Sequence, residues 1–460
     1  MLVYVWMIVS CLLFTLPCDS SEAYRIEVVD AGNGWPVPLV ELRTTHAMRF
    51  VTDNAGVIAI DAPELMGRET FFHVIGHGYG VDQDGFGYRG ISLTPQPGKA
   101  VRIEVKRANI AKRIGRMTGG GLFAESQKLG EYTDWSDAPL LGQDSVLVTR
   151  YGDKLFWAWG DTTLRHYPLG VFDTVAATTS PRPFESFKPP LKPVFDHMVD
   201  SRTGRPRGVA KMPGDGPTWI TGLIALPDKN GEERLVATYT KIRRHLHAYE
   251  RGLCEWDDQT ESFKRVRILW REGDARYTFR QWHDCHPFIY LDDLGEERVG
   301  MGNPLPKISF PATYESWRNP DTWRTHRPQP TLRDAAGGAN IHPHTGAVTW
   351  NPYRKKWITV FMQKDGSPSP LGEVWYAESD EPFGVWGPAV KILTHDNYTF
   401  YNIRIHHELT DKEDGFIVFE GTYTAEFADD PEPTPRYNYN QVLYRLDLDD
   451  PKLAPAHKDY

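Results

Sequence analysis

Residues 145–159 read SVLVTRYGDKLFWAW. Two short apolar runs, 145–149 and 155–159, flank a polar turn that contains Gly152, which is the pattern of a β-hairpin. Comparable turns recur with a period of about 60 residues, at Gly231, Gly295, Arg354 and Gly415. A second apolar hairpin follows most of these turns. Four short strands per repeat are typical of a propeller blade. The sequence therefore predicts an all-β protein with a five-bladed β-propeller over residues 131–452.

The chain before residue 131 has a different pattern. Residues 24–107 alternate apolar and polar positions in short runs separated by Gly, Pro, Asp and Asn, which predicts a small antiparallel β-sandwich. The phrases at 37–42, 52–56 and 76–79 resemble the carboxypeptidase regulatory-like domain, which is a transthyretin-like sandwich. That resemblance implies a spacer or packing module without chemistry of its own. Residues 108–130 contain three consecutive glycines but lack the lysine and hydroxyl of a phosphate-binding loop, so we expect a linker.

The first 23 residues predict a signal peptide. An apolar run from Leu2 to Pro17 contains no Lys or Arg and precedes the small-x-small pattern Ser21-Glu22-Ala23. The alternative, an N-terminal membrane anchor, needs a longer apolar stretch. We therefore expect a secreted or periplasmic protein with no stable membrane insertion after cleavage.

The charge of the chain argues against nucleic acid as a partner. The formal net charge is −9, and the basic runs Lys106-Arg107, Lys112-Arg113 and Arg243-Arg244 are short. Neither feature provides the clustered Lys and Arg that phosphate backbones require. Outside the predicted signal peptide the cysteines are Cys254 and Cys285, which allow one disulfide without establishing it.

The first hairpin places two carboxylates opposite each other. If the chain turns between Gly152 and Asp153, Asp144 faces Asp161 across the two strands. Like charges in that position destabilise a sheet, and their proximity pushes the two pKa values apart. One protonated and one ionised carboxyl group form the acid and base of a glycosidase. As alternatives, the pair caps tight turns or binds a structural cation such as Ca²⁺; we expect no other cofactor.

Counting outward from the turn in the same way predicts which residues face each other in the other hairpins. It places Trp219 opposite Thr240, Asp284 opposite Asn303, His344 opposite Gln363, and His406 opposite Glu420. We take Asp284 and Glu420 as further catalytic candidates. The candidates for contacts to a sugar are Trp159, Trp219, His286, His344, His406, Tyr423 and Arg436.

The residues around the carboxylate pair also carry a family resemblance. Gly142-Gln143-Asp144-Ser145 and Trp159-Gly160-Asp161-Thr162 resemble the first blade of the five-bladed propeller glycoside hydrolases, namely family 43 and the endo-D-arabinanase-like superfamily, in an uncharacterised exported bacterial branch. The resemblance covers roughly residues 110–450 and implies that Asp144 and Asp161 are the active-site acids. His344 and Gln363 occupy the position of the fourth-blade catalytic glutamate of family 43, so no counterpart of that glutamate is found. The acid is then a member of the pair or Glu420.

These observations favour an exported glycoside hydrolase that acts on a polysaccharide or oligosaccharide. A non-catalytic carbohydrate-binding propeller is the first alternative. The second is a polysaccharide lyase, in which His406 or His286 acts with Tyr423 to abstract a proton, while Arg404 or Arg436 neutralises a uronate carboxylate.

Overall fold

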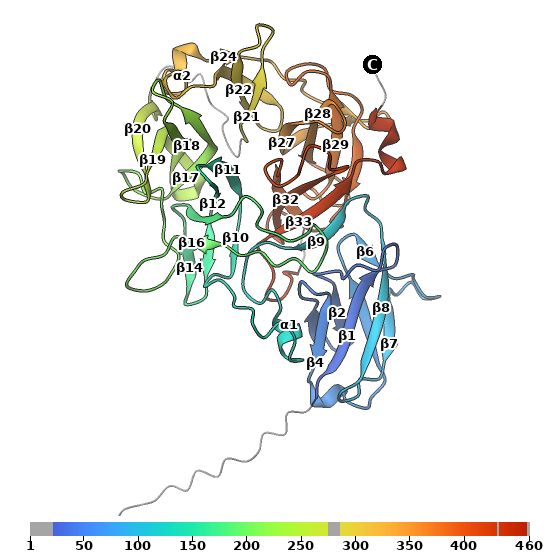
Figure 1. Cartoon of the computed structure of the whole chain (residues 1–460). Coiled ribbons are helices and arrows are strands. Elements are labelled where there is room, and N and C mark those ends of the chain that lie inside the picture. Colours follow the sequence, from blue (N-terminus) through green and yellow to red (C-terminus); the bar gives the residue numbers. More distant parts are fainter. Residues whose placement is uncertain (1–21, 275–285, 430–431, 458–460) are drawn as a thin grey trace, which may run out of the picture.

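The computed structural model describes residues 22–274, 286–429 and 432–457 (Figure 1). Strands form most of the regular structure, so the predicted all-β class is confirmed. None of the helices in the described ranges has the length and apolar character needed to cross a membrane. Most of the predicted signal peptide, Asp284 and Cys285 lie outside the described residues.

The N-terminal part consists of two four-stranded sheets packed face to face. One sheet has the order β4 (Val57–Ile60), β1 (Tyr24–Asp30), β8 (Ala100–Arg107) and β6 (Tyr79–Gly80). The other has the order β3 (Arg49–Val51), β2 (Glu41–Thr44), β5 (Thr70–Ile75) and β7 (Gly90–Leu93). Alternate side chains of both sheets meet in one core, which includes Ile26, Val28, Leu42, Phe72 and Ile103. We refer to this part as the sandwich.

Five further four-stranded antiparallel sheets occur in the described part of the chain, and we call them blades 1 to 5. Blade 1 has β11 (Leu147–Tyr151), β12 (Lys154–Trp159), β15 (Val175–Thr179) and β16 (Asp196–His197). Blade 2 has β17 (Thr218–Pro227), β18 (Glu233–Arg243), β19 (His247–Asp257) and β20 (Ser262–Arg271). Blade 3 has β21 (Phe288–Leu291), β22 (Glu297–Gly302), β23 (Pro306–Pro311) and β24 (Arg324–Thr325). Blade 4 has β27 (Pro343–Asn351), β28 (Lys356–Gln363), β29 (Val374–Ser379) and β30 (Val390–Leu393). Blade 5 has β31 (Thr399–Ile405), β32 (Phe416–Thr424), β33 (Asn440–Asp447) and β9 (Lys112–Arg116).

Hydrophobic clusters join each blade to the next. One cluster packs Leu147 of blade 1 against Leu235 of blade 2, and others join blades 2 and 3, blades 3 and 4, and blades 4 and 5. The last cluster returns to the start, with Leu443 of blade 5 packed with Trp157 of blade 1. The sheets thus form a closed circle, which is a β-propeller (Figure 1).

The segment at 108–130, expected to be a linker, supplies the strand that closes this circle. It contains β9 and the short helix α1 (Ala124–Gln127). β9 is antiparallel to β33, with Arg116 opposite Val442, and is therefore the outer strand of blade 5. The ring is closed by hydrogen bonds between the two ends of the propeller sequence.

The remaining elements are small. A three-stranded sheet of β10 (Gly142–Gln143), β13 (Thr162–Leu164) and β14 (Tyr167–Val171) extends the first hairpin of blade 1. A two-stranded sheet pairs β25 (Leu332–Arg333) with β26 (Asn340–Ile341). The other helical turns are α2 (Tyr314–Arg318), η1 (Pro63–Leu65), η2 (Arg244–Leu246), η3 (Pro320–Thr322) and η4 (Pro451–His457).

Candidate active site

The first hairpin has the predicted register. β10 pairs with β13 so that Gln143 lies opposite Thr162. One residue further along, the Asp144 amide donates to the Asp161 carbonyl at 3.2 Å, and the Gly160 amide donates to the Asp144 carbonyl at 2.8 Å. The predicted opposition of Asp144 and Asp161 is confirmed.

Two glycines of this motif make room for the site. A Cβ atom on Gly160 would lie 2.3 Å from Oδ1 of Asp144, and one on Gly142 would lie 2.0 Å from the carbonyl oxygen of Tyr439. Both distances are far below van der Waals contact. Glycine at 160 therefore lets the Asp144 carboxylate fold over its partner strand, and glycine at 142 lets the Tyr439 backbone approach.

Asp144 is held by protein donors on both carboxylate oxygens. Its Oδ1 accepts a hydrogen bond from the Asp161 amide at 2.7 Å, and its Oδ2 accepts one from the Tyr401 hydroxyl at 2.9 Å. Burial raises the pKa of Asp144, while hydrogen bonds from Tyr439, Tyr401 and the Asp161 amide oppose that rise. Each oxygen of the Asp144 carboxylate thus accepts a hydrogen bond from the protein. Among the described residues, no group of three or more His, Cys, Asp or Glu is arranged to hold a metal ion.

Asp161 borders a cavity of about 610 Å³. Its Oδ1 accepts a hydrogen bond from the Trp219 indole at 3.0 Å. Trp219 lies opposite Thr240 in blade 2, as predicted. Burial and the charge of Asp144 raise the pKa of Asp161 to about 7. Asp161 therefore holds its proton up to near-neutral pH.

The connection between β32 and β33 brings three more functional groups to this cavity: Glu426, Arg436 and Tyr439. Burial and the charge of Asp144 raise the pKa of Glu426. The Arg436 guanidinium is about half exposed and forms an ion pair with Glu125 at 2.7 Å. Glu426 is not predicted from the sequence, because it follows its strand in a connection, where no partner can be counted from a hairpin turn. Its place two residues after the apolar run of β32 is the only sequence signal.

Residues with positive φ gather around the carboxylates. Ser145, Asn402, Arg436 and Tyr439 have φ values of 56°, 54°, 66° and 65°. Side chains other than glycine rarely adopt this conformation, and such strain is concentrated at functional sites. The Asn402 amide group donates to the Ser145 hydroxyl at 2.6 Å, so the two strained residues of blades 5 and 1 stabilise each other.

Two aromatic candidates lie elsewhere. Trp159 is 1% exposed and packs against Trp157 and Phe195 in the core between blades, because its side chain points into the layer between the sheets. Tyr423 is fully buried and contacts His77 of the sandwich. The expected contact of these two side chains with a sugar is therefore not supported by their positions.

The candidates of blade 5 are buried inside the propeller. Glu420 pairs with Arg404 and not, as predicted, with His406, because the ends of β31 and β32 next to the turn pair two residues away from the predicted register. The His406 Nε2 atom still lies 3.5 Å from Glu420 Oε2, and both side chains are fully buried. His286 is buried too. Glu420, His406 and His286 are not among the residues that line the cavity.

Blades 3 and 4 also depart from the predicted register. A bulge between Pro343 and Gly346 places Gln363 opposite Pro343, while His344 is exposed and does not line the cavity. β21 and β22 pair Phe288 with Gly300, one residue away from the register that sets Asp284 opposite Asn303. The position of Asp284 itself lies outside the described residues.

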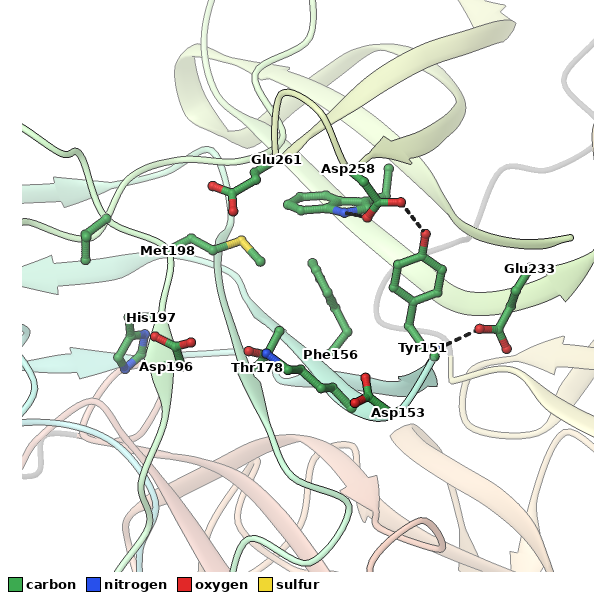
Figure 2. Close-up of a pocket in the computed structure, with 14 residues that line it drawn as sticks. Tyr151, Asp153, Phe156, Thr178, Asp196, His197, Met198, Glu233, Asp258 and Glu261 are labelled. Carbon is green, nitrogen blue, oxygen red and sulfur yellow. Dashed lines mark hydrogen bonds between the residues drawn. The ribbon is translucent and has the colours of Figure 1, made fainter.

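A second cavity, of about 690 Å³, lies at the other end of β11 and β12 (Figure 2). Its walls include Tyr151 and Trp256, and its acids are Asp153, Asp196, Glu233, Asp258 and Glu261. The Tyr151 hydroxyl donates to Asp258 at 2.8 Å, as Figure 2 shows. None of the described site candidates lines this second cavity.

No protein-family model matches the chain, and no curated protein matches it. Among solved structures, the chain is similar to an exo-1,5-α-L-arabinanase from a bovine ruminal metagenomic library, with 11% identity and a TM-score of 0.37, over 67% of this chain and 94% of that one. It is similar to an α-L-arabinanase mutant of Cellvibrio cellulosa, with 11% identity and a TM-score of 0.39, over 66% and 91%. An α-L-arabinofuranosidase of Podospora anserina shares 9% identity at a TM-score of 0.37, over 73% and 96%.

Proposed function

We propose that this chain is a glycoside hydrolase that acts on a polysaccharide or oligosaccharide. The observation that carries the proposal is the presence of two carboxyl groups, Asp161 and Glu426, in one cavity, with the pKa of Asp161 raised to about 7. Cleavage of a glycosidic bond needs a protonated carboxyl group for the leaving oxygen and an ionised one for the other face of the sugar.

The environments of the acids assign different roles to them. Asp161 donates its proton to the glycosidic oxygen, because it reaches the cavity and keeps its proton near neutral pH. Asp144 does not line the cavity and acts through its charge, which raises the pKa of Asp161. Glu426 is the more exposed carboxylate and activates the water or attacks the anomeric carbon.

Neighbouring side chains bind and orient the sugar. Arg436 lines the cavity with a guanidinium group, which donates hydrogen bonds to sugar hydroxyls, and the Tyr439 hydroxyl, whose proton goes to Asp144, accepts one from the sugar. The Trp219 indole holds Asp161 in place. The lyase alternative receives no comparable support, because His406, His286 and Tyr423 are buried away from the cavity.

Export belongs to the same proposal. The apolar run before Ser21 supports a signal peptide, and a soluble or cell-wall glycan outside the cytoplasm is a suitable substrate. N-terminal sequencing of the protein recovered from its producing cell checks this point. A mature chain that does not begin at about residue 24 contradicts the predicted cleavage.

The test is a screen of plant, algal and microbial glycans for release of reducing ends. We expect turnover of at least one glycan by the unmodified protein and a loss of about 10²-fold or more in Glu426→Gln. The matched control is Glu233→Gln, which alters a carboxylate of the second cavity and leaves turnover unchanged. Binding of glycans without cleavage of any contradicts the proposal and favours the carbohydrate-binding alternative.

A further inference from the structure

The segment 432–439 carries Arg436 and Tyr439 to the cavity and lies between β32 and β33 outside either strand. Because it belongs to no sheet, its position depends on side chains that hold it from outside. The Thr434 amide donates to the Tyr398 hydroxyl at 3.0 Å, and that hydroxyl donates to Asn438 Oδ1 at 2.6 Å. The Tyr423 hydroxyl lies 3.0 Å from Thr434 Oγ1. Two buried tyrosines of blade 5 thus fix both halves of the segment.

These tyrosines are themselves held by the sandwich. His77 stacks on Tyr398 with ring centroids 4.4 Å apart and an interplanar angle of 20°, and its Nδ1 hydrogen-bonds the Tyr423 hydroxyl. Burial and the charge of Arg113 lower the pKa of His77 to about 3, so the imidazole is neutral at physiological pH. A neutral ring stacks between the tyrosines without bringing a charge into the interface.

The turn that presents His77 is fixed in the same interface. His77 has a φ of 44°, and Arg113 of β9 donates to the carbonyl oxygens of Gly76 and His77 at 3.1 and 2.8 Å. Arg113 is 1% exposed and also donates to the Tyr444 hydroxyl at 3.0 Å. If the turn moved, the buried Arg113 guanidinium would lose these hydrogen bonds and its charge would be left uncompensated. The turn therefore has little freedom to move.

Glu125 provides a second link between the sandwich and segment 432–439. This carboxylate is 5% exposed; its Oε2 accepts from the Ala59 amide of β4 at 3.2 Å, and its Oε1 accepts from Arg436 at 2.7 Å. The sandwich strand β4 thereby fixes the orientation of a carboxylate that in turn orients the Arg436 guanidinium in the cavity.

We propose that the sandwich is a positioning element of the cavity: its residue His77, and Glu125 of α1, which the sandwich strand β4 holds, set the place of Tyr439 and Arg436 through segment 432–439. His77 acts through Tyr398 and Tyr423, and Glu125 acts directly on Arg436. The role of the cavity rests on the proposed function, whereas the coupling between sandwich and segment does not. Both residues are positioning residues and touch no substrate.

The experiment measures amide hydrogen exchange of segment 432–439 in the full chain, which requires no turnover. His77→Ala removes both the stacking and the hydrogen bond, and we expect exchange of the segment to be about fivefold faster or more. His77→Asn retains a polar atom near the position of Nδ1 and tolerates positive φ, so it restores most of the protection. Leu65→Ala is the control: it weakens the sandwich core but belongs to a cluster of sandwich residues alone.

Kinetics provide the second readout. With a cleaved glycan, His77→Ala lowers kcat/KM about tenfold, and Glu125→Gln raises KM more than it lowers kcat because Arg436 loses its orientation. Wild-type exchange of the segment in folded His77→Ala, or equal acceleration in Leu65→Ala, overturns the inference. If His77→Ala does not fold, exchange in Glu125→Gln decides the question. If no glycan is cleaved, the proposed function fails while the exchange result still stands.

Discussion

The two ends of the hairpin formed by β11 and β12 present opposite kinds of acidic cavity. At one end, Asp144 and Asp161 face each other, partly buried, and accept hydrogen bonds from tyrosine hydroxyls, an indole and a backbone amide. At the other end, around Tyr151, exposed carboxylates such as Asp153 and Asp196 face solvent (Figure 2). The second cavity has more acids and a larger volume, yet only the first shifts a carboxyl pKa to about 7. A carboxyl group becomes a proton donor when it is desolvated beside a second acid. A larger number of exposed acids does not have this effect.

The largest difference between the two ends concerns turnover. Asp161→Asn removes the proton donor and should lower kcat by about 10³-fold or more while glycan binding remains. Asp258→Asn is the matched change at the other end and should leave kcat within about twofold. Steady-state kinetics and calorimetric binding check both values. Equal losses of kcat in the two variants would contradict the prediction that only the first cavity supports turnover.

The second prediction concerns stability and pH. The folded-state pKa of Asp161 is raised to about 7 from 3.8, so the folded protein binds this proton more tightly than the unfolded chain. Stability from this group is therefore complete below pH 4 and is lost as the pH rises towards 7. Asp161→Asn should raise the free energy of unfolding at pH 8 by an amount on the order of a few kcal/mol and leave it unchanged at pH 4. Urea unfolding at both pH values measures this. A variant that is equally stable or less stable at pH 8 contradicts the assignment.

The third prediction concerns the donor to Asp144. Tyr401→Phe removes the hydrogen bond to Oδ2 and raises the pKa of Asp144 further, which weakens the charge that keeps the proton on Asp161. We expect kcat to fall about tenfold and the basic limb of the pH profile to move to lower pH. The control is Tyr376→Phe in blade 4, where a buried tyrosine donates to Glu378 at 2.6 Å and lines neither of the two cavities described above. A pH profile unchanged in Tyr401→Phe contradicts the prediction.

The smallest effect is expected at the second cavity. Tyr151→Phe removes one half-exposed hydrogen bond to Asp258, which should cost about 1 kcal/mol of unfolding free energy or less. Turnover and its pH dependence should stay at their wild-type values. A shift of the pH profile in this variant would show that the two ends of the hairpin communicate.

The sequence predicted those parts of the site that depend on an uninterrupted register. β10, β11, β12 and β13 keep one register from Gly142 to Tyr151, so arithmetic from the turn at Gly152 located the opposition of Asp144 and Asp161. In blade 4, a bulge shifts the partner of Gln363, since a single extra residue moves a side chain to another neighbour. In blade 5, the long connection between β31 and β32 turns at another place than expected, which moves the partner of Glu420 by two residues. The turn sequences contain no signal for either change.

The remaining parts of the site depend on contacts between segments distant in sequence. Glu426 and Tyr439 lie in a connection whose residues Asn438 and Thr434 are hydrogen-bonded to Tyr398 and Tyr423. The burial of Trp159 follows from the packing of Phe195 against it, which no local pattern indicates. The sequence therefore revealed the all-β class and the acid pair, while the third acid and the role of the sandwich required the assembled chain.

The closing strand β9 also determines when this protein completes its folding. Arg113 in β9 and Tyr444 in β33 are joined by a hydrogen bond across 331 residues of chain. During synthesis, β9 is made before every other strand of the propeller, whereas β33, the strand with which it pairs, is made last. Such a high contact order slows the final step, and until then the incomplete ring exposes a strand edge to other chains. A chain truncated before β33 should therefore fail to close the ring, aggregate, and never assemble the cavity that depends on it.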